Sequence, residues 1–283
     1  MTGFVFASVL FAALLHASWN ALVKSSSDTA LDMGLIHLIG SIIAIPLLAV
    51  IGWPPASAWP FIATSVVIHL GYYIALTGAY QHGELGLTYP IMRGSAPVLV
   101  ALASLFVFPE APSLLGWAGI LAVSAGVLAL GITAGIMRHR RALGFALANA
   151  VTIALYTVVD GLGVRASSAP LQYVTTLFVL DGWPFALLLL AQRGREGRLA
   201  GVLPYAAKRW PVATGGALAS FGAYGIALWA MTHAPVALVA ALRESSVLFA
   251  ALLGTFFLKE KFTVRRAAAT CVIAAGMIAV RLG

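Results

Sequence analysis

A small set of ionisable side chains interrupts long apolar stretches of this chain. Several stretches are long enough to cross a membrane, where a charged side chain costs at least about 2.5 to 3.5 kcal/mol unless it is paired or hydrated. A residue retained at that cost is a functional candidate. The set comprises Arg93, Asp160, Asp181, Arg243, Glu244, His16, His37, His69 and His233.

Arg93 and Arg243 occupy equivalent places in two similar segments, 86–108 and 235–258. If both faced one cavity, their guanidinium groups would attract a carboxylate or a phosphate, since arginine binds either group with paired hydrogen bonds. The alternative is structural. Each arginine then extends toward the membrane surface or pairs internally, Arg243 for example with Asp181.

Glu244, Asp181 and His16 are the candidates for a proton-coupling group. Adjacent residues on a helix point about 100° apart, so Arg243 and Glu244 cannot both face the same wall. Glu244 is therefore either a protonatable site or a structural partner for an arginine or histidine on another helix. Asp181 begins the sequence Asp-Gly-Trp-Pro, which a simple helix distortion also explains.

Aromatic residues away from the span ends favour a small organic ligand over a bare ion, because organic ligands bind where apolar walls carry a few polar groups. Tyr72 and Tyr224 occupy corresponding places in the two similar segments, as do Trp19 and Tyr156 approximately. The alternative is packing between helices. With the two arginines, the predicted substrate-binding residues are Trp19, Asn20, Tyr72, Tyr73, Tyr89, Arg93, Tyr156, Tyr224, Trp229, Arg243 and Ser245.

The composition excludes a water-soluble protein. The chain is 61% hydrophobic and 9% charged, whereas soluble domains carry roughly 25% charged residues. Its net charge of +8 fits basic loops at a cytoplasmic membrane face. The expected partners are the lipid bilayer, a small-molecule substrate and, if transport is coupled, protons, but not nucleic acid. The single cysteine, Cys271, excludes an internal disulfide or cysteine metal cluster, and no cofactor or metal is expected.

Apolar segments of about 20 residues, the length needed to span a bilayer as a helix, follow one another with short connections. This pattern predicts an all-α integral membrane protein with ten transmembrane helices. The predicted spans are 3–23, 32–51, 59–81, 86–108, 114–136, 142–163, 171–191, 211–233, 235–258 and 264–281.

The two halves of the chain resemble each other. Arg93 aligns with Arg243, Glu110 with Glu260 and Gly126 with Gly276, each at an offset of 150. The pattern predicts two five-helix repeats, 1–137 and 138–283. Because five is odd, the second repeat enters the membrane from the opposite side, which gives inverted repeats around a central cavity, an architecture typical of transporters that work by alternating access.

Basic residues predict the orientation. Thirteen of the 17 Lys and Arg residues lie in or beside connections after odd-numbered spans, and only Arg165 and Arg281 lie on the opposite side. The positive-inside rule places the odd connections in the cytoplasm and both termini outside, in a multi-pass protein of the cell inner membrane.

The segment from Arg243 onward resembles the closing part of an EamA-type domain of the drug/metabolite transporter superfamily, and the segment from Ser95 is similar. The likeness lies in Glu110 and Glu260, each closing a fourth helix, and in a small-residue fifth helix ending in Ala-Gly. It implies ten helices, with the first, third, fourth, sixth, eighth and ninth lining a cavity. It also implies export of amino acids or other metabolites. Family members are often drawn with cytoplasmic termini, against the charge pattern, and commonly have Gly-Glu where this chain has Pro109-Glu110 and Lys259-Glu260.

The sequence thus predicts an inner-membrane transporter that exports amino acids, including aromatic ones, or similar small amphipathic metabolites. The alternative within the same fold is a drug, nucleoside or sugar-phosphate transporter. A membrane-embedded enzyme is disfavoured, since Asp160-Gly161-Leu162-Gly163 lacks the Gly-x-Gly-Asp order of intramembrane aspartyl proteases. A passive channel would lack saturation and counter-transport. The oligomeric state is left open, with a monomer plausible.

Overall fold

The computed structural model describes residues 1–24, 26–131, 139–258 and 263–283. Within these ranges every regular element is helical, and the helices α1 to α8 are long and apolar enough to cross a membrane. The α-helices are α1 (Gly3–Lys24), α2 (Thr29–Ile51), α3 (Trp59–His82), α4 (Leu85–Val107), α5 (Leu114–Gly131), α6 (Arg140–Ser167), α7 (Pro170–Arg195), α8 (Val202–Met231), α9 (Val236–Arg243), α10 (Ser246–Leu258) and α11 (Val264–Leu282). The predicted all-helical class is confirmed for these residues, eight of whose helices are candidate membrane spans.

Local capping chemistry sets several helix boundaries. The Asp28 carboxylate accepts a hydrogen bond of 3.1 Å from the backbone N–H of Leu31 and so caps α2. Gly52 ends α2 with a positive φ of 81°, a conformation that glycine adopts without a Cβ clash. Thr263 caps α11 by accepting from the N–H of Arg266. These short caps allow consecutive helices to turn back within a few residues.

The segment 235–258, predicted as one span, forms two helices. From Glu244 to Leu248 several backbone N–H groups bond to carbonyls three residues earlier instead of four, which tightens the chain between α9 and α10. In contrast, α4 continues through Pro90 and Pro97, although the prolines suggested an irregular backbone there. The interruption thus lies in the second segment, where no proline predicts it.

The segment 264–281 lies within α11, which carries Arg265, Arg266 and Arg281. Three cations in a helix of 19 residues reduce its apolar character, so α11 does not join α1 to α8 as a candidate span. The count of ten spanning helices therefore remains a prediction.

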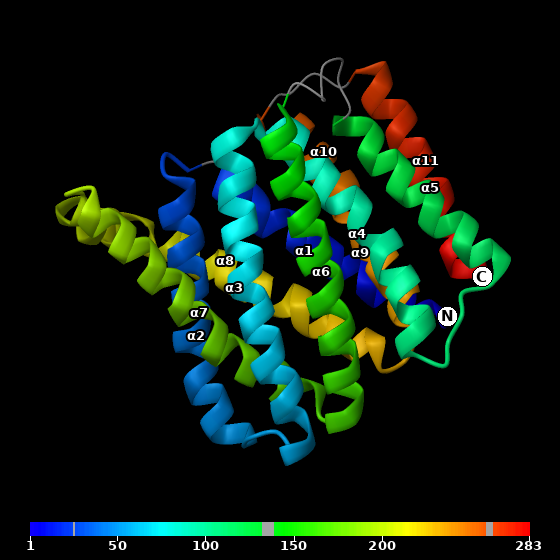
Figure 1. The fold of residues 1–283 in the computed structure, drawn as a ribbon, viewed down its shortest axis with the longest axis horizontal. Helices are drawn as coiled ribbons and strands as arrows, with labels where there is room; N and C mark the ends of the chain where they lie inside the picture. Colours follow the sequence, from blue (N-terminus) through cyan, green and yellow to red (C-terminus); the bar gives the residue numbers. More distant parts are fainter. Residues whose placement is uncertain (25, 132–138, 259–262) are drawn as a thin grey trace.

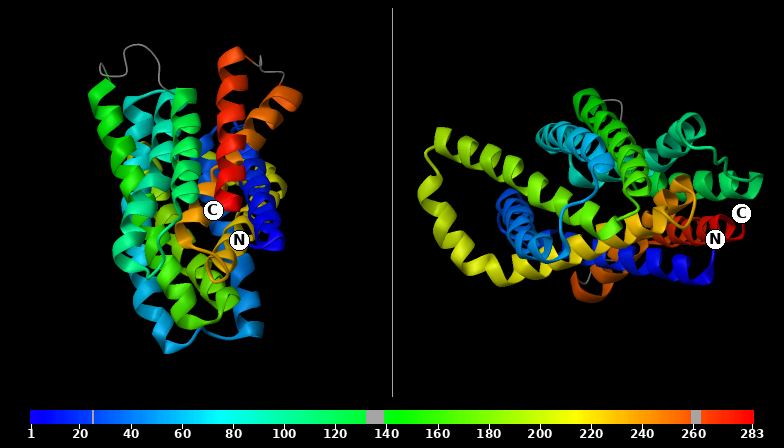
Figure 2. Two further views of the ribbon diagram at one scale, coloured as in Figure 1. Left: turned by 90° about the vertical axis from the view of Figure 1, so that its right-hand side faces the viewer. Right: turned by 90° about the horizontal axis from the view of Figure 1, so that it is seen from below.

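The helices pack in pairs that join distant parts of the chain. α3 packs against α6, α1 against α8, and α2 against α7, while α5 and α11 lie side by side at the edge of the molecule (Figure 1). The two ends of the chain lie close together in both further views (Figure 2). Pairing between distant segments means that helices of both halves surround the centre of the molecule.

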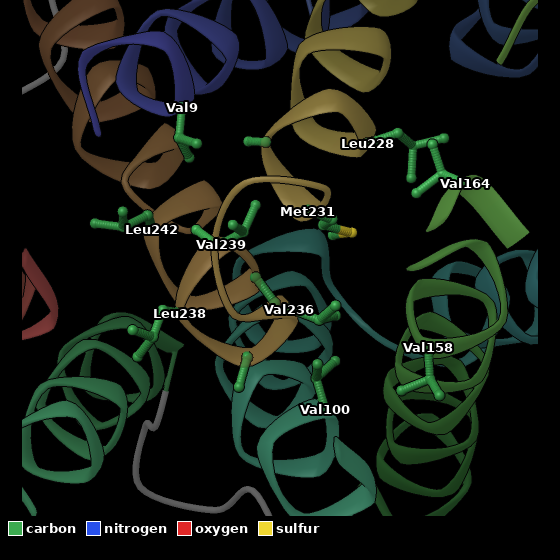
Figure 3. Close-up of a cluster of buried hydrophobic side chains, with 14 of the residues drawn as sticks. Val9, Val100, Val158, Val164, Leu228, Met231, Val236, Leu238, Val239 and Leu242 are labelled. Atoms are coloured by element: carbon green, nitrogen blue, oxygen red, sulfur yellow. The ribbon is translucent and has the colours of Figure 1, made fainter. Parts of the chain in front are cut away.

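α9 lies in the hydrophobic core. Its residues Val236 to Leu242 are all buried, and Figure 3 shows Val239 and Leu242 of α9 near Val9 of α1, with Val100 of α4 and Val158 of α6 in the same cluster. A helix that is apolar on every side is buried on every side. Packing on all faces of α9 fixes the position of Arg243, its last residue.

Glycines allow α5 and α11 to pack closely. A Cβ atom built on Gly276 of α11 would lie 2.9 Å from the carbonyl oxygen of Gly119 and 2.8 Å from the Val123 side chain on α5. A Cβ atom on Gly119 would lie 2.7 Å from the Gly276 carbonyl oxygen. Small residues permit such backbone contact between membrane helices.

We expect Gly276→Ala to destabilise the protein by about 1 to 3 kcal/mol, because the added methyl group must push α11 away from α5. The melting temperature in detergent measures the effect. Gly144→Ala on α6 is the matched control, since nothing lies within 4 Å of a Cβ atom there. An unchanged melting temperature for Gly276→Ala would contradict the close contact.

Candidate substrate-binding site

A cavity of about 100 Å³ lies between helices of both halves of the chain. Its wall is formed by α1, α2 and α3 from the first half and by α6, α7, α8 and α9 from the second. The lining residues are His16, Trp19, Met33, His37, His69, Tyr72, Tyr73, Tyr156, Leu177, Phe178, Asp181, Gly182, Ser220, Tyr224 and Arg243. Eight predicted site residues are among them: His16, Trp19, Tyr72, Tyr73, Tyr156, Asp181, Tyr224 and Arg243.

Aromatic rings form much of the wall. The imidazole of His69 stacks on Tyr156 with ring centroids 4.4 Å apart, and Tyr156 lies 6.1 Å from Tyr72 and 6.3 Å from Tyr224. Tyr73 stacks on Phe185 at 4.5 Å. Rings that pack against one another leave flat apolar faces and phenol hydroxyls for a ligand, a combination that suits amphipathic organic molecules.

Arg243 is the cation of the cavity wall. Its guanidinium carbon lies 5.3 Å from the centre of the Tyr224 ring, a cation–π contact. It forms no ion pair with any residue that the structure describes. The guanidinium group therefore keeps its hydrogen-bond donors available for a negatively charged ligand.

Arg93 has a different environment from Arg243, although the two align in the repeat. It is buried, and its Nε atom lies 3.0 Å from Oε2 of Glu244, which is buried as well. The residue that aligns with Glu244 in the first half is Gly94. The acid next to Arg243 thus neutralises Arg93, and neither Arg93 nor Glu244 lines the cavity.

Asp181 is the acid of the cavity wall. The Tyr73 hydroxyl donates a hydrogen bond of 2.8 Å to its Oδ2 atom, which leaves the Tyr73 oxygen to accept from Nδ1 of His37 at 3.3 Å. The Oδ1 atom of Asp181 is buried and has no hydrogen-bond partner. Asp181 does not pair with Arg243, so the internal ion pair considered from the sequence does not form.

Asp160 differs from Asp181 because both of its oxygens are occupied. Tyr173 donates to Oδ1 at 2.8 Å, and Tyr224 donates to Oδ2. Asp160 is fully buried and does not line the cavity. Its role is to orient Tyr224, whose ring faces Arg243.

Two predicted residues of α1 interact within their own helix. The indole N–H of Trp19 donates to Nδ1 of His16 at 3.3 Å, and both side chains line the cavity. Asn20 donates to the backbone oxygen of His16 at 2.7 Å and does not line it. The face of α1 that carries His16 and Trp19 therefore points to the cavity.

Three more predicted residues do not line the cavity. Tyr89 packs in an apolar cluster that also contains Tyr72 and Tyr156 of the cavity wall, and the buried Ser245 hydroxyl has no hydrogen-bond partner. Trp229 lies 5.7 Å from Phe4 and lines an apolar groove of about 630 Å³ between α1, α7 and α8.

The prediction omitted several lining residues. His37 and His69 carried a signal, since both are ionisable groups inside apolar segments. Met33, Leu177, Phe178, Gly182 and Ser220 carried none, because such residues are as common in helix packing as in ligand sites. No three His, Cys, Asp or Glu side chains gather into a metal site in the described part of the chain.

Comparison with known proteins identifies the family. Residues 140–282 match the EamA-like transporter family. The chain belongs to this family. The resemblance seen in the sequence is thereby confirmed, and the EamA-like transporter is a multi-pass membrane transporter of small molecules.

Solved structures show the same fold. Twenty-eight chains of solved structures match this chain. One of them, described only as the crystal structure of a protein, superposes on 98% of this chain and 96% of its own with a TM-score of 0.74 and 17% sequence identity. At 17% sequence identity this likeness shows the fold but not the substrate. No curated protein matches.

Ion pairs join the helices of this EamA-like transporter at both ends of the cavity. At one end Arg193 binds Asp28 with bonds of 2.9 and 2.7 Å, and Arg209 binds Asp32. At the other end Arg165 binds both carboxylate oxygens of Glu110, at 2.9 and 3.1 Å. Arg165 also donates to the carbonyl oxygens of Met231 and Ala234.

The helices that line the cavity differ from those implied by the family resemblance. α2 and α7 contribute to the wall, whereas α4 does not. Arg93, the residue of α4 expected at the cavity, is bound to Glu244 instead.

Proposed function

We propose that this protein is a secondary transporter that exports amino acids, including aromatic ones, or similar small amphipathic metabolites by alternating access. The observation that carries the proposal is the cavity shared by both halves, in which aromatic walls surround the unpaired Arg243. An aromatic surface suits an apolar side chain, and a guanidinium group suits a carboxylate.

The proposed architecture is ten spanning helices in two inverted five-helix repeats. Here α9 and α10 together form the ninth span and α11 forms the tenth. The packing supports this repeat, because equivalent helices make equivalent contacts with the other half. α1 packs on α8 as its counterpart α6 packs on α3, and α4 packs on α6 as its counterpart α10 packs on α1. The predicted boundary between the repeats, 137/138, lies outside the described residues.

The proposed location is the cell inner membrane. In the proposed orientation both termini lie outside, and the connections after odd-numbered spans lie in the cytoplasm. This orientation rests on the distribution of basic residues, because Arg140 at the start of α6 and Arg193 near the end of α7 lie on one side, whereas Arg165 near the end of α6 lies on the other. The basic residues of 138 and 259–261 lie outside the described residues.

The cavity volume of about 100 Å³ is smaller than that of ordinary ligand sites, which measure about 300 to 1,000 Å³. An aromatic amino acid therefore requires the helices to separate at one end. The ion pairs at the two ends are suited to this role because each links segments that are distant in the chain and each is partly exposed.

We expect Arg165→Gln to open the end closed by Glu110 and Arg193→Gln to open the opposite end. An ion pair near the surface contributes about 1 kcal/mol or less, so labelling rates should rise up to about fivefold. The reporter is Ser220→Cys in the cavity, in a Cys271→Ala background, labelled by an impermeant maleimide from each side. Arg198→Gln is the control, since its exposed pair with Glu196 joins no helices. Faster labelling from the same side in both variants would contradict this assignment.

Proton coupling is proposed at Asp181 or His16, because both line the cavity where substrate would bind. Glu244 is assigned to the pairing of Arg93 instead. Phosphorylated substrates are less suited to this cavity, since the Asp181 carboxylate repels a phosphate.

Uptake into sealed proteoliposomes tests the proposed function. Labelled amino acids, nucleosides and a sugar phosphate are supplied with and without a pH gradient. Saturable amino-acid uptake, competed by unlabelled amino acids, is the expected result, and stimulation by the gradient would establish proton coupling. Uptake restricted to nucleosides or sugar phosphates would contradict the proposal.

A further inference from the structure

The central cavity contains two side chains of opposite charge that do not neutralise each other. Asp181 on α7 and Arg243 at the end of α9 both line it, yet no ion pair joins them. Elsewhere in the described core, Arg93 and Glu244 form an ion pair, and Asp160 accepts hydrogen bonds from two tyrosines. Among the described residues, Asp181 and Arg243 thus line one cavity without an ion-pair partner.

The Asp181 carboxylate is positioned so that one of its oxygens can accept a hydrogen bond from a ligand. Tyr73 fixes its Oδ2 atom, and Tyr73 is itself held by His37 and by stacking on Phe185. The Oδ1 atom is buried and unpartnered. An unmade hydrogen bond at a buried carboxylate is costly, so a donor from a ligand would bind there favourably.

The Arg243 guanidinium group is positioned so that its N–H groups can donate hydrogen bonds to a ligand. The Tyr224 ring covers one side of its guanidinium group, and Asp160 fixes the Tyr224 hydroxyl. The nearby acid Glu244 forms its ion pair with Arg93 and not with Arg243. The donors of Arg243 therefore match a carboxylate that enters with the ligand.

We propose that the cavity recognises zwitterions, with Asp181 binding the ammonium group of an α-amino acid and Arg243 binding its carboxylate. This inference rests on the proposed function and narrows it. A ligand with both charges satisfies both side chains at once, whereas an amine or an acid alone leaves one of the two charged side chains without a partner. The cavity therefore selects against molecules that lack either group.

Competition binding separates these contributions. The full-length protein in lipid nanodiscs binds labelled phenylalanine, and the competitors are phenylalanine, phenethylamine, which lacks the carboxylate, and 3-phenylpropionate, which lacks the ammonium group. With the wild-type protein both analogues should compete at least about tenfold more weakly than phenylalanine. This factor corresponds to one charged hydrogen bond.

Variants assign the two charges. Asp181→Asn should weaken phenylalanine about 10-fold to 100-fold while leaving 3-phenylpropionate unchanged or stronger. Arg243→Gln should weaken phenylalanine and leave phenethylamine unchanged. Arg198→Gln, which removes a charge from an exposed pair outside the cavity, should preserve the ranking. Equal melting temperatures show that the variants are folded.

Distinct outcomes overturn the inference and the function. If phenylalanine binds but 3-phenylpropionate competes equally, zwitterion recognition is wrong and amino-acid transport stands. The same holds if Asp181→Asn weakens all three ligands equally. If no amino acid binds or is transported in either system, both the inference and the proposed function are wrong.

Discussion

Replacing Arg243 with glutamine is expected to lower the rate of amino-acid transport about 100-fold. Arg243 is the cation of the cavity wall and has no acidic partner among the described residues. A hydrogen bond to a charged group contributes about 1.5 to 3 kcal/mol, and a bidentate contact lies at the upper end of that range. The initial rate of saturable uptake into proteoliposomes measures the loss.

The conservative variant distinguishes charge from geometry. Arg243→Lys keeps the positive charge but loses the planar fork and its contact with the Tyr224 ring, so part of the activity should remain. The protein should stay folded in both variants, as judged by a single symmetric peak in size-exclusion chromatography. Full transport by Arg243→Gln would remove this residue from the substrate site.

Replacing Arg93 with methionine is expected to destabilise the protein by about 3 to 5 kcal/mol. The change leaves the buried Glu244 carboxylate without its cation, and an uncompensated buried charge is far more costly than the ion pair itself. Arg93 lies on α4 and Glu244 between α9 and α10, so the pair joins the two halves of the chain. The melting temperature and the yield of folded protein in detergent should both fall.

The double variant Arg93→Met with Glu244→Gln tests this reason directly. Removing both charges from a buried pair is often neutral, so stability should return to within about 1 kcal/mol of the wild type. Transport should return with it, because neither side chain lines the cavity. A stable double variant without transport would instead assign Arg93 a direct role with substrate, as the sequence alone suggested.

Much of the fold follows from the length of apolar segments. α1 to α8 correspond to the first eight predicted spans because a helix must satisfy its own backbone hydrogen bonds within a bilayer. The interruption between α9 and α10 was not predictable in this way. It coincides with a buried ion pair to α4 and with packing around α9, neither of which leaves a local signal.

The candidate site was predictable only in part. Ionisable and aromatic types within apolar segments pointed to Asp181, Arg243 and Tyr224, which do line the cavity. Which face of a membrane helix meets a cavity cannot be read from hydropathy, because lipid-facing and protein-facing positions are both apolar. Trp229 was therefore assigned to the cavity, whereas its ring lines a separate groove.

The sequence repeat predicted the same role for Arg93 and Arg243. In the structure their roles differ, because Arg93 pairs with Glu244 whereas Arg243 lines the cavity. Their alignment reflects the similarity of the two segments, but Glu244 has Gly94 as its counterpart. Only the fold shows that the side chain of Glu244 reaches Arg93 and not Arg243. The chemical difference between the two halves thus depends on one residue outside the matched pattern.

Counterflow in proteoliposomes tests the central claim most directly. Vesicles loaded with unlabelled phenylalanine are placed in a low concentration of labelled phenylalanine, so a carrier that alternates between sides must accumulate the label transiently. The account predicts this overshoot for the wild-type protein and its loss in Arg243→Gln. Equilibration without an overshoot in the wild type, or an undiminished overshoot in Arg243→Gln, would contradict a cavity at which Arg243 binds the transported molecule.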